Sequence, residues 1–386
     1  MKVLMISKAC VVGAYQKKLE EIARHDGVEL TVVVPPEWQD ERGSLRLERV
    51  HTSGYDLRIE PIAFNGHFHL HYYPTLKGVM RDVQPDVVHI DEEPYNLATF
   101  RAMRSARRLG ARTVVFTWQN LQRRYPPPFG WMESYVLAHT DALLTGNAEG
   151  ADVWRAKGYT GPVEVIPQFG VDPDIYQRIT RPSRPSKPSV LLRRSARRPS
   201  QSEMVIGYIG RLVPEKGIDL LLEAVAQLQG PWELRILGSG PERDRLEKMA
   251  QWLGILPRVS FDLPIPSTQM PYYYSGLDVL VLPSRTRPNW KEQFGRVLIE
   301  AMACQVVVVG ARCGAIPEVI GDAGLTFAEG DSADLRTQLQ ILLGDTHLRL
   351  DLAQMGRQRV LDQFTQSQIA ARTVQIYQEL ARDSLQ

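Results

Sequence analysis

The chain has 386 residues, of which 44% are apolar and 23% are charged, and its formal net charge at pH 7 is +2. This length exceeds one ordinary domain, and so small a charge gives no electrostatic case for nucleic acid as a partner. No apolar run approaches the ~18 residues that a membrane-spanning helix needs. The three cysteines, Cys10, Cys304 and Cys313, have neither disulfide nor metal spacing, as is typical of reduced thiols in a cytoplasmic protein.

The first half of the chain alternates short β-branched runs with helical patterns. Strands are predicted at 3–7, 30–34, 87–90, 113–117, 142–145 and 163–166, and helices near 15–24, 75–83, 95–109, 131–139 and 148–157. This alternation predicts a doubly wound parallel sheet, whose strands are apolar on both faces. The less regular segment 44–64 leaves room for an extra hairpin.

A segment of different composition separates the two halves. Residues 181–202 carry seven Lys/Arg and no acid, and prolines 182, 185, 188 and 199 interrupt any regular element. These features favour an exposed linker over 176–203. Contact with a membrane surface or a polyanion is the alternative.

A second series follows the linker. Strands are predicted at 205–209, 233–237, 259–261, 279–282 and 306–310, and helices near 218–228, 242–253, 267–275, 295–304, 333–343 and 365–381. The expected organisation is a first domain over 1–175, a second over 204–364, and a final helix over 365–386 that packs on the first domain. The fold class is α/β.

The first informative motif is a turn between a strand and a helix, Gly207-Tyr-Ile-Gly-Arg-Leu-Val-Pro-Glu-Lys-Gly217. It places Arg211 and Lys216 at the carboxyl edge of the predicted sheet, where ligands of doubly wound folds bind. Two cations there would neutralise a diphosphate. A surface turn with two solvated bases is the alternative.

The second motif is the segment Glu292-Gln-Phe-Gly-Arg-Val-Leu-Ile-Glu300. A helix is expected to begin near Phe294 and Gly295, and its free N–H groups would suit phosphate oxygens. Glu300 could then accept hydrogen bonds from ribose hydroxyls, and Glu292 could meet hydroxyls of a sugar. The alternative is an amphipathic helix with an acid near its N-terminus.

Together the two motifs resemble the retaining family-4 glycosyltransferases of the GT-B fold, the group 1 glycosyl transferases. That family shows a Gly-Arg-Leu…Glu-Lys-Gly turn and a Glu-x7-Glu motif, and supporting pieces follow the same order at 237–241, 282–284 and 314–319. The resemblance is strong over about 203–330. It implies two Rossmann-like domains whose parallel sheets face each other across a cleft, with the C-terminal helix crossing back to the first domain.

The resemblance also implies roles for individual residues. Arg211 and Lys216 would bind the diphosphate of a nucleotide-sugar donor, with the backbone of Phe294 and Gly295 capping it. Gly240 would lie near the nucleoside, Glu300 would hold the ribose, and Glu292 would be the catalytic candidate that contacts the sugar. The family needs no metal or cofactor. Asp172-Pro173-Asp174 imitates a metal motif, yet it follows what looks like the family's interdomain turn.

The first domain departs from the family. A single glycine, Gly13, stands where relatives have a glycine-rich loop near the donor phosphate. Relatives often carry a histidine after the fourth strand, but this chain reads Phe116-Thr-Trp-Gln-Asn120 there. His89 is the nearest histidine, and a packed structural role is its alternative. Trp118 and Asn120 are candidates to bind sugar by stacking and hydrogen bonds.

The implied reaction transfers a sugar to a hydroxyl acceptor with retention of configuration. A sugar-nucleotide epimerase and a non-catalytic sugar-nucleotide-binding protein are the alternatives. The acceptor is left open, as a polysaccharide, a glycolipid or a small molecule. Arginines at 101, 104, 107, 108, 112, 123 and 124, with the aromatic-proline run 125–131, suggest an anionic or membrane-surface acceptor at the inner face of the membrane, or else a solvated helix face.

Overall fold

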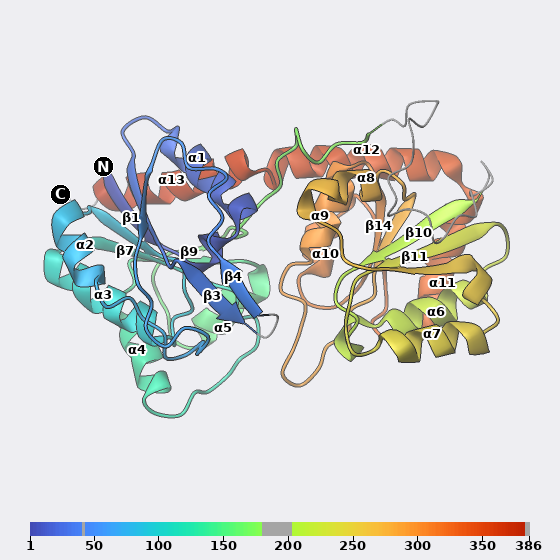
Figure 1. Ribbon diagram of the computed structural model, residues 1–386, viewed down its shortest axis with the longest axis horizontal. Coiled ribbons are helices and arrows are strands. Elements are labelled where there is room, and N and C mark those ends of the chain that lie inside the picture. The colour runs from blue at the N-terminus through green and yellow to red at the C-terminus, as the bar shows by residue number, and fades with distance from the viewer. Residues whose placement is uncertain (41–42, 180–202, 383–386) are drawn as a thin grey trace. The chain divides into compact units, whose positions relative to one another are not determined.

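The computed structural model describes residues 1–40, 43–179 and 203–382, which form two compact units (Figure 1). Unit 1 comprises 1–170 and 364–386, and unit 2 comprises 171–363. Most of the basic segment that the sequence marks as a linker, 180–202, lies outside the described residues.

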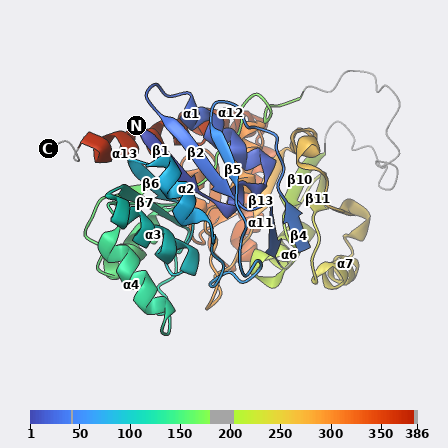
Figure 2. The same cartoon turned by 60° about the vertical axis from the view of Figure 1, so that its left-hand side comes forward.

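Unit 1 is built on a seven-stranded parallel sheet in the order β5-β2-β1-β6-β7-β8-β9. Figure 2 labels the neighbouring strands β5, β2, β1, β6 and β7. Its strands are β1 (Lys2–Ile6), β2 (Glu29–Val34), β5 (Asp56–Ile59), β6 (Val87–Ile90), β7 (Arg112–Thr117), β8 (Ala142–Thr145) and β9 (Val163–Val165). In the register, Ile6 pairs with Ile90, and Thr117 pairs with Thr145. The carboxyl ends of β1, β6, β7 and β8 therefore share one edge.

Helices cover both faces of this sheet. They are α1 (Lys17–Ala23), α2 (Leu76–Val83), α3 (Leu97–Leu109), α4 (Phe129–His139), α5 (Ala148–Ala156) and α13 (Gln366–Arg382). One core joins strand residues such as Met5 to α1 and α13, and the other joins residues such as Leu4 to α2, α3, α4 and α5. Burial on both faces explains why the strands read as continuous apolar runs.

The final helix belongs to unit 1, as the fold prediction expects. α13 packs along α1, beside which it is drawn in Figure 1. Its residues Ile369, Val374 and Tyr377 are buried in the same core as Leu19 and Ile22 of α1.

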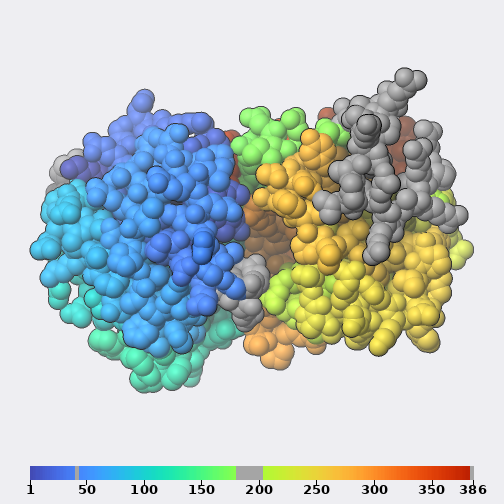
Figure 3. All heavy atoms as spheres, in the orientation of Figure 1, coloured from blue at the N-terminus to red at the C-terminus, as the bar shows by residue number. Residues whose placement is uncertain are grey.

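The irregular segment of unit 1 differs from its prediction. The hairpin lies earlier, as antiparallel β3 (Glu37–Asp40) and β4 (Gly43–Arg46), while β5 adds a parallel edge strand inside 44–64. The side chains of β4 and β5 are mostly exposed, so they carry little of the apolar pattern that marks a strand. In Figure 3 this early part of the chain, in blue, forms much of the visible surface of unit 1.

Unit 2 has a six-stranded parallel sheet in the order β12-β11-β10-β13-β14-β15. Its strands are β10 (Met204–Ile209), β11 (Trp232–Leu237), β12 (Val259–Asp262), β13 (Val279–Leu282), β14 (Val307–Ala311) and β15 (Leu325–Phe327). Its helices are α6 (Ile218–Ala226), α7 (Arg243–Trp252), α8 (Met270–Tyr274), α9 (Arg296–Ala303), α10 (Ile316–Ile320), α11 (Ser332–Gly344) and α12 (Thr346–Gln363). The central strands β10 and β13 are buried along their whole length.

Strand β15 and helix α12 of unit 2 were not predicted from the sequence. The buried positions of α12 are only Leu352, Ala353, Gly356 and Val360, too few to mark an amphipathic stripe. By contrast, α11 has a clear N-cap residue: the Asp331 side chain accepts hydrogen bonds from the N–H groups of Ala333 and Asp334. The prediction of two Rossmann-like units, each with a parallel sheet, is confirmed.

Candidate functional site

Two glycine-containing turns pack closely at the carboxyl edge of the unit 2 sheet. The Gly210 N–H donates to the Leu237 carbonyl at 3.0 Å, and the Leu212 N–H donates to the Ser239 carbonyl at 2.9 Å. A Cβ atom on Gly240 would lie 2.2 Å from the Leu212 carbonyl oxygen. Close backbone packing is therefore one reason for glycine at this position, which the sequence analysis assigned to the nucleoside.

The Lys216 turn is bound to the end of β13. The Arg285 N–H donates to the Glu215 carbonyl at 2.7 Å, which holds the turn beside Ser284. Lys216 lies in a short 3₁₀ helix, Pro214–Lys216, and Arg211 is exposed at the start of the same turn.

Lys216 and Glu292 form an ion pair, with 2.6 Å between Nζ and Oε2. The Ser284 hydroxyl donates to the same oxygen at 2.9 Å, and the Lys216 ammonium lies 4.8 Å from the centre of the Trp290 ring. Glu292 is only 7% exposed. Because an ammonium has three N–H donors, Lys216 can keep Glu292 and still donate to a phosphate oxygen.

The backbone at Glu292 is held by the segment between β14 and α10. The Ala315 N–H donates to the Glu292 carbonyl at 3.1 Å. Helix α9 begins at Arg296, with Gly295 as its N-cap in a left-handed conformation (φ +77°) that favours glycine. Phe294 is buried just before it. The structure thus brings Lys216, Glu292 and the start of α9 together.

Glu300, one helical turn into α9, is surrounded by donors. Tyr274 Oη donates to Oε2 at 2.8 Å, Tyr176 Oη donates to Oε1 at 3.4 Å, and Arg296 Nε lies 2.8 Å from Oε1. Burial, reinforced by the Glu300 charge, raises the pKa of both tyrosines above the usual range. Both phenols therefore stay protonated and donate to the carboxylate.

The sequence motifs did not predict Tyr274, Tyr176 or Ser284 as site residues. Tyr176 is fixed by Arg357 of α12, whose guanidinium donates to the Tyr176 and Ala303 carbonyls at 2.6 Å each. Ser284 had a signal, because it follows directly on a buried strand at the ligand-binding edge. For the tyrosines no local pattern exists, since they reach Glu300 from distant parts of the chain.

In unit 1, Gly13 already has an internal partner. Its N–H donates to Glu48 Oε2 at 2.6 Å, and a Cβ atom on Gly13 would lie 2.4 Å from Val50 Cγ2. Gln16 holds the same segment by accepting the N–H of Val50 at 3.1 Å. The segment 47–51 therefore covers the glycine that the resemblance places near a donor phosphate.

His89 lies in the core of unit 1 and not at its surface. Its side chain is fully buried, and Nδ1 lies 2.5 Å from the Tyr377 hydroxyl of α13. Burial lowers the pKa of His89 well below its usual range, so the imidazole is neutral. In this conformation His89 cannot touch a sugar, which agrees with the structural alternative.

Trp118 and Asn120 follow β7 at the carboxyl edge. Trp118 is partly exposed, and its indole N–H donates to Gln168 Oε1 at 2.8 Å. Asn120 is 7% exposed, with its amide nitrogen 3.5 Å from Glu149 Oε2. Of the two, Trp118 has the more accessible side chain.

A buried ionic cluster ties the segment before α2 to this edge. The fully buried Glu92 pairs with Lys8 Nζ, and His71 Nε2 lies 3.4 Å from the same carboxylate oxygen. The Lys8 ammonium also lies over the rings of Trp38 and Phe68, at 5.3 and 4.9 Å from their centres. Burial alone would raise the pKa of Glu92, but the charges of Lys8 and His71 outweigh it and lower that pKa to about 2.

Glu92 should therefore stabilise the protein at neutral pH and cease to do so in acid. A carboxylate with a lowered pKa contributes stability above its unfolded pKa, and this contribution is lost as the pH falls toward 2. We expect Glu92→Gln to lower the free energy of unfolding at pH 7 by about 3 kcal/mol. Between about pH 4.5 and 2 the variant should lose less stability than the wild type. Urea unfolding of the wild type and the variant at pH 7 and between about pH 4.5 and 2 checks both expectations. An equal loss of unfolding free energy with pH in the two proteins would contradict the role given to Glu92.

Among the residues that the structure describes, no three His, Cys, Asp or Glu side chains gather as a metal site would require. Asp172 accepts the N–H of Asp174 at 3.0 Å through its side chain. Within the same described ranges, no helix combines the length and apolarity needed to cross a membrane.

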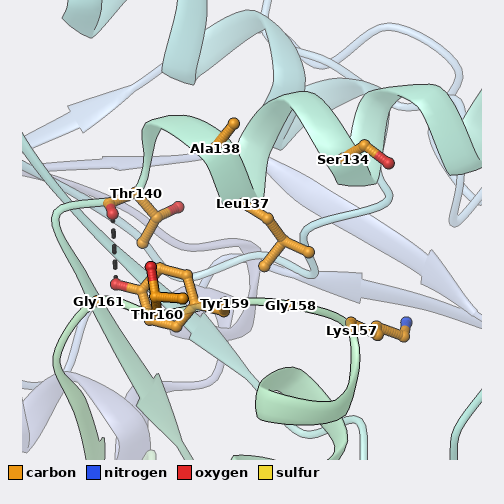
Figure 4. A pocket seen from close by; sticks show the side chains of 9 residues that line it. All are labelled: Ser134, Leu137, Ala138, Thr140, Lys157, Gly158, Tyr159, Thr160 and Gly161. Atoms are coloured by element: carbon orange, nitrogen blue, oxygen red, sulfur yellow. Dashed lines mark hydrogen bonds between the residues drawn. The ribbon is translucent and has the colours of Figure 1, made fainter.

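A surface pocket of about 360 Å³ lies between the end of α4 and the turn after α5. Figure 4 shows Tyr159 in this pocket, with its hydroxyl donating to the Thr140 carbonyl. None of the predicted site residues lines it.

Two family models match the chain. Residues 193–359 match the glycosyl transferases group 1 model, and residues 12–168 match the glycosyl transferase 4-like domain. Together they span both units, and the boundary between them falls in the segment that separates the two sheets.

Curated relatives match only part of this chain. The GDP-mannose-dependent alpha-(1-6)-phosphatidylinositol monomannoside mannosyltransferase of Mycolicibacterium smegmatis is 35% identical over 165 residues, 41% of this chain and 43% of the relative. The D-inositol 3-phosphate glycosyltransferase of Stackebrandtia nassauensis is 31% identical over 248 residues, 59% and 52% respectively. The chain spans about half the length of the curated relatives it matches.

The fold has close solved counterparts. The Anabaena protein HepE, solved in complex with UDP, has 19% sequence identity and a TM-score of 0.72, with 98% of this chain and 100% of that chain covered. At this identity the likeness shows the fold. Together with the two family matches, it shows that the chain belongs to glycosyltransferase family 4, the group 1 glycosyl transferases of the GT-B fold.

Proposed function

We propose that this protein transfers a sugar from a nucleoside diphosphate sugar to a hydroxyl acceptor, with retention of anomeric configuration and without a metal. The observation that carries the proposal is the pairing of Lys216 with Glu292 beside the start of α9. It supplies a cation for a diphosphate and a carboxylate for a sugar hydroxyl at the edge of a parallel sheet where ligands bind.

The donor is a co-substrate, and the proposal includes no further cofactor. The names of relatives support a nucleotide donor, since one is GDP-mannose-dependent and HepE is in complex with UDP. Arg211 and Lys216 would neutralise the departing diphosphate, which is the task of a metal in other transferases. A departing phosphate can take the proton of the acceptor hydroxyl, so a histidine base is not required.

The direct test is a binding screen of UDP-, GDP- and ADP-sugars by thermal stabilisation. A true donor stabilises the folded state by mass action. The nucleotide sugar that shifts the melting temperature is then assayed for sugar transfer in the presence and absence of EDTA. Undiminished transfer in EDTA with a retained anomer supports the proposal. Sugar isomerised without acceptor would indicate an epimerase, and binding without turnover would indicate a binding protein.

We also propose that unit 1 contacts an anionic membrane surface, with the protein at the cytoplasmic face. Trp131 of α4 is 61% exposed, and its ring centre lies 5.2 Å from that of Phe100. The guanidinium of Arg104 in α3 also lies near Phe100, 5.6 Å from its ring centre. Exposed aromatic and basic side chains side by side suit a charged interface.

Membrane contact predicts a loss of vesicle binding in the double variant Trp131→Ala/Arg104→Glu. The wild type should co-sediment with vesicles of anionic phospholipid, less so at high salt. Trp252→Ala is the matched control, because Trp252 is 82% exposed on unit 2. Absence of the wild type from the pellet at every salt concentration would refute this contact.

A further inference from the structure

One aromatic side chain of unit 1 is held at the sheet edge from several directions. The indole N–H of Trp118 donates to Gln168, and its main-chain N–H donates to Glu93 Oε1 at 2.9 Å. The ring lies against Gly146, where an added Cβ atom would come within 1.9 Å of it. The ring of Phe116 packs against it edge-on, with centres 5.2 Å apart. Only glycine at 146 leaves room for the indole in this place.

A buried hydrogen-bond chain continues from Trp118 into the core. Gln168 Nε2 donates to Asp91 Oδ1 at 2.9 Å, and the Ser7 hydroxyl donates to Asp91 Oδ2 at 2.5 Å. All three side chains behind Trp118 are less than 10% exposed. Burial raises the pKa of Asp91, while Lys18 and the hydrogen bonds from Ser7 and Gln168 oppose that shift. Both Asp91 oxygens accept hydrogen bonds, so the NH₂ of Gln168 faces Asp91. The Gln168 oxygen is thereby left to receive the indole N–H.

Core packing alone does not account for this arrangement. Burying an amide and a carboxylate costs free energy even when they are hydrogen-bonded, and an apolar side chain would fill the same space at less cost. The chain orients one partly exposed ring, and that ring stands at the carboxyl edge, where doubly wound sheets bind ligands. A fixed aromatic face presents an apolar surface on which the C–H side of a sugar ring can stack.

We propose that Trp118 is a stacking platform for a sugar ring, and that Gln168 and Asp91 are positioning residues that hold its indole. The inference rests on the proposed function, since it names the ligand chemistry of the same reaction. The sugar comes either from the donor or from the acceptor, and both present the same C–H face.

The test uses Trp118→Ala, Trp118→Phe and Gln168→Met in the full chain. Binding of the free nucleoside diphosphate should be unchanged in all three, because its proposed contacts lie in unit 2. We expect kcat/KM to fall about 10- to 100-fold in Trp118→Ala and about fivefold in Gln168→Met. Trp154→Phe is the matched control, because Trp154 is fully buried in unit 1 but is not part of the hydrogen-bond chain behind Trp118. This variant should lower the melting temperature and leave kcat/KM unchanged.

A double variant separates positioning from general destabilisation. Phenylalanine has no N–H to donate, so in a Trp118→Phe background Gln168→Met should have little further effect on kcat/KM. Two assays identify the source of the sugar. Weaker binding of the nucleotide sugar, but not of the nucleotide, assigns the platform to the donor. A raised KM for acceptor with unchanged donor hydrolysis assigns it to the acceptor.

Two negative results are distinguishable. A wild-type chain that binds no nucleotide sugar overturns the proposed function and this inference together. A wild-type chain that binds and transfers, with Trp118→Ala matching it in nucleotide-sugar affinity, acceptor KM and turnover, overturns the platform alone. Equal losses from Gln168→Met in the wild-type and Trp118→Phe backgrounds would overturn the positioning role of Gln168.

Discussion

Lys216→Ala should lower kcat/KM for the nucleotide sugar about 100- to 1000-fold, the loss typical of removing one preorganised donor from a developing negative charge. The ammonium acts on two groups. It lies 2.6 Å from Glu292 Oε2, and its remaining N–H donors are free to reach a phosphate. Alanine therefore removes the diphosphate cation, and the mostly buried Glu292 keeps the Ser284 hydroxyl as a donor to Oε2. Steady-state kinetics measure the loss, with the nucleotide sugar that raises the melting temperature as substrate.

The control separates this effect from unfolding. Lys248→Ala removes an exposed lysine of α7 in the same unit and should leave kinetics and melting temperature unchanged. Lys216→Arg should retain more activity than Lys216→Ala, because it keeps the charge. If Lys216 and Glu292 act together, Lys216→Ala should lower kcat/KM much less in a Glu292→Gln background than in the wild type. Near wild-type turnover in folded Lys216→Ala would reject the assigned site.

The sequence predicts best what depends on neighbouring residues. Both parallel sheets, the Lys216 turn and the start of α9 follow from local patterns: apolar runs, glycine positions and the spacing of charges. Gly295 is an example, because its left-handed conformation at the N-cap is a local requirement. Helix α12 was not predicted because its few buried residues form no apolar stripe that a local pattern could reveal.

Contacts between distant segments could not be predicted from a single sequence. Glu292 was assigned to a sugar and Lys216 to a diphosphate, but nothing in either segment indicates that they pair with each other across 76 positions. Glu48 reaches Gly13 in the same way, from the irregular segment that follows β4. Such pairings depend on how the chain returns to the sheet edge, which no motif records.

Glu300 lies in an environment that the sequence did not reveal. Its carboxylate receives Tyr274 at 2.8 Å and has Arg296 at 2.8 Å, so both oxygens are oriented before any ligand arrives. Two carboxylate oxygens offer about four acceptor positions, and Tyr274, Tyr176 and Arg296 use three of them, which leaves one for a ribose hydroxyl. Hydrogen bonds to a charged group contribute about 1.5–3 kcal/mol each. Glu300→Gln should therefore weaken nucleotide binding about 10- to 100-fold.

Tyr274→Phe distinguishes orientation from direct contact. It leaves the Glu300 charge in place but removes the donor that fixes Oε2, so nucleotide affinity should fall less than in Glu300→Gln, by about fivefold. Glu223→Gln on α6 is the matched control and should bind as the wild type does. Calorimetric titration with the free nucleoside diphosphate gives all four affinities without requiring an acceptor. Wild-type affinity in a folded Glu300→Gln variant would remove Glu300 from the donor site, while the Lys216 result would still stand, because the two side chains bind different parts of the donor.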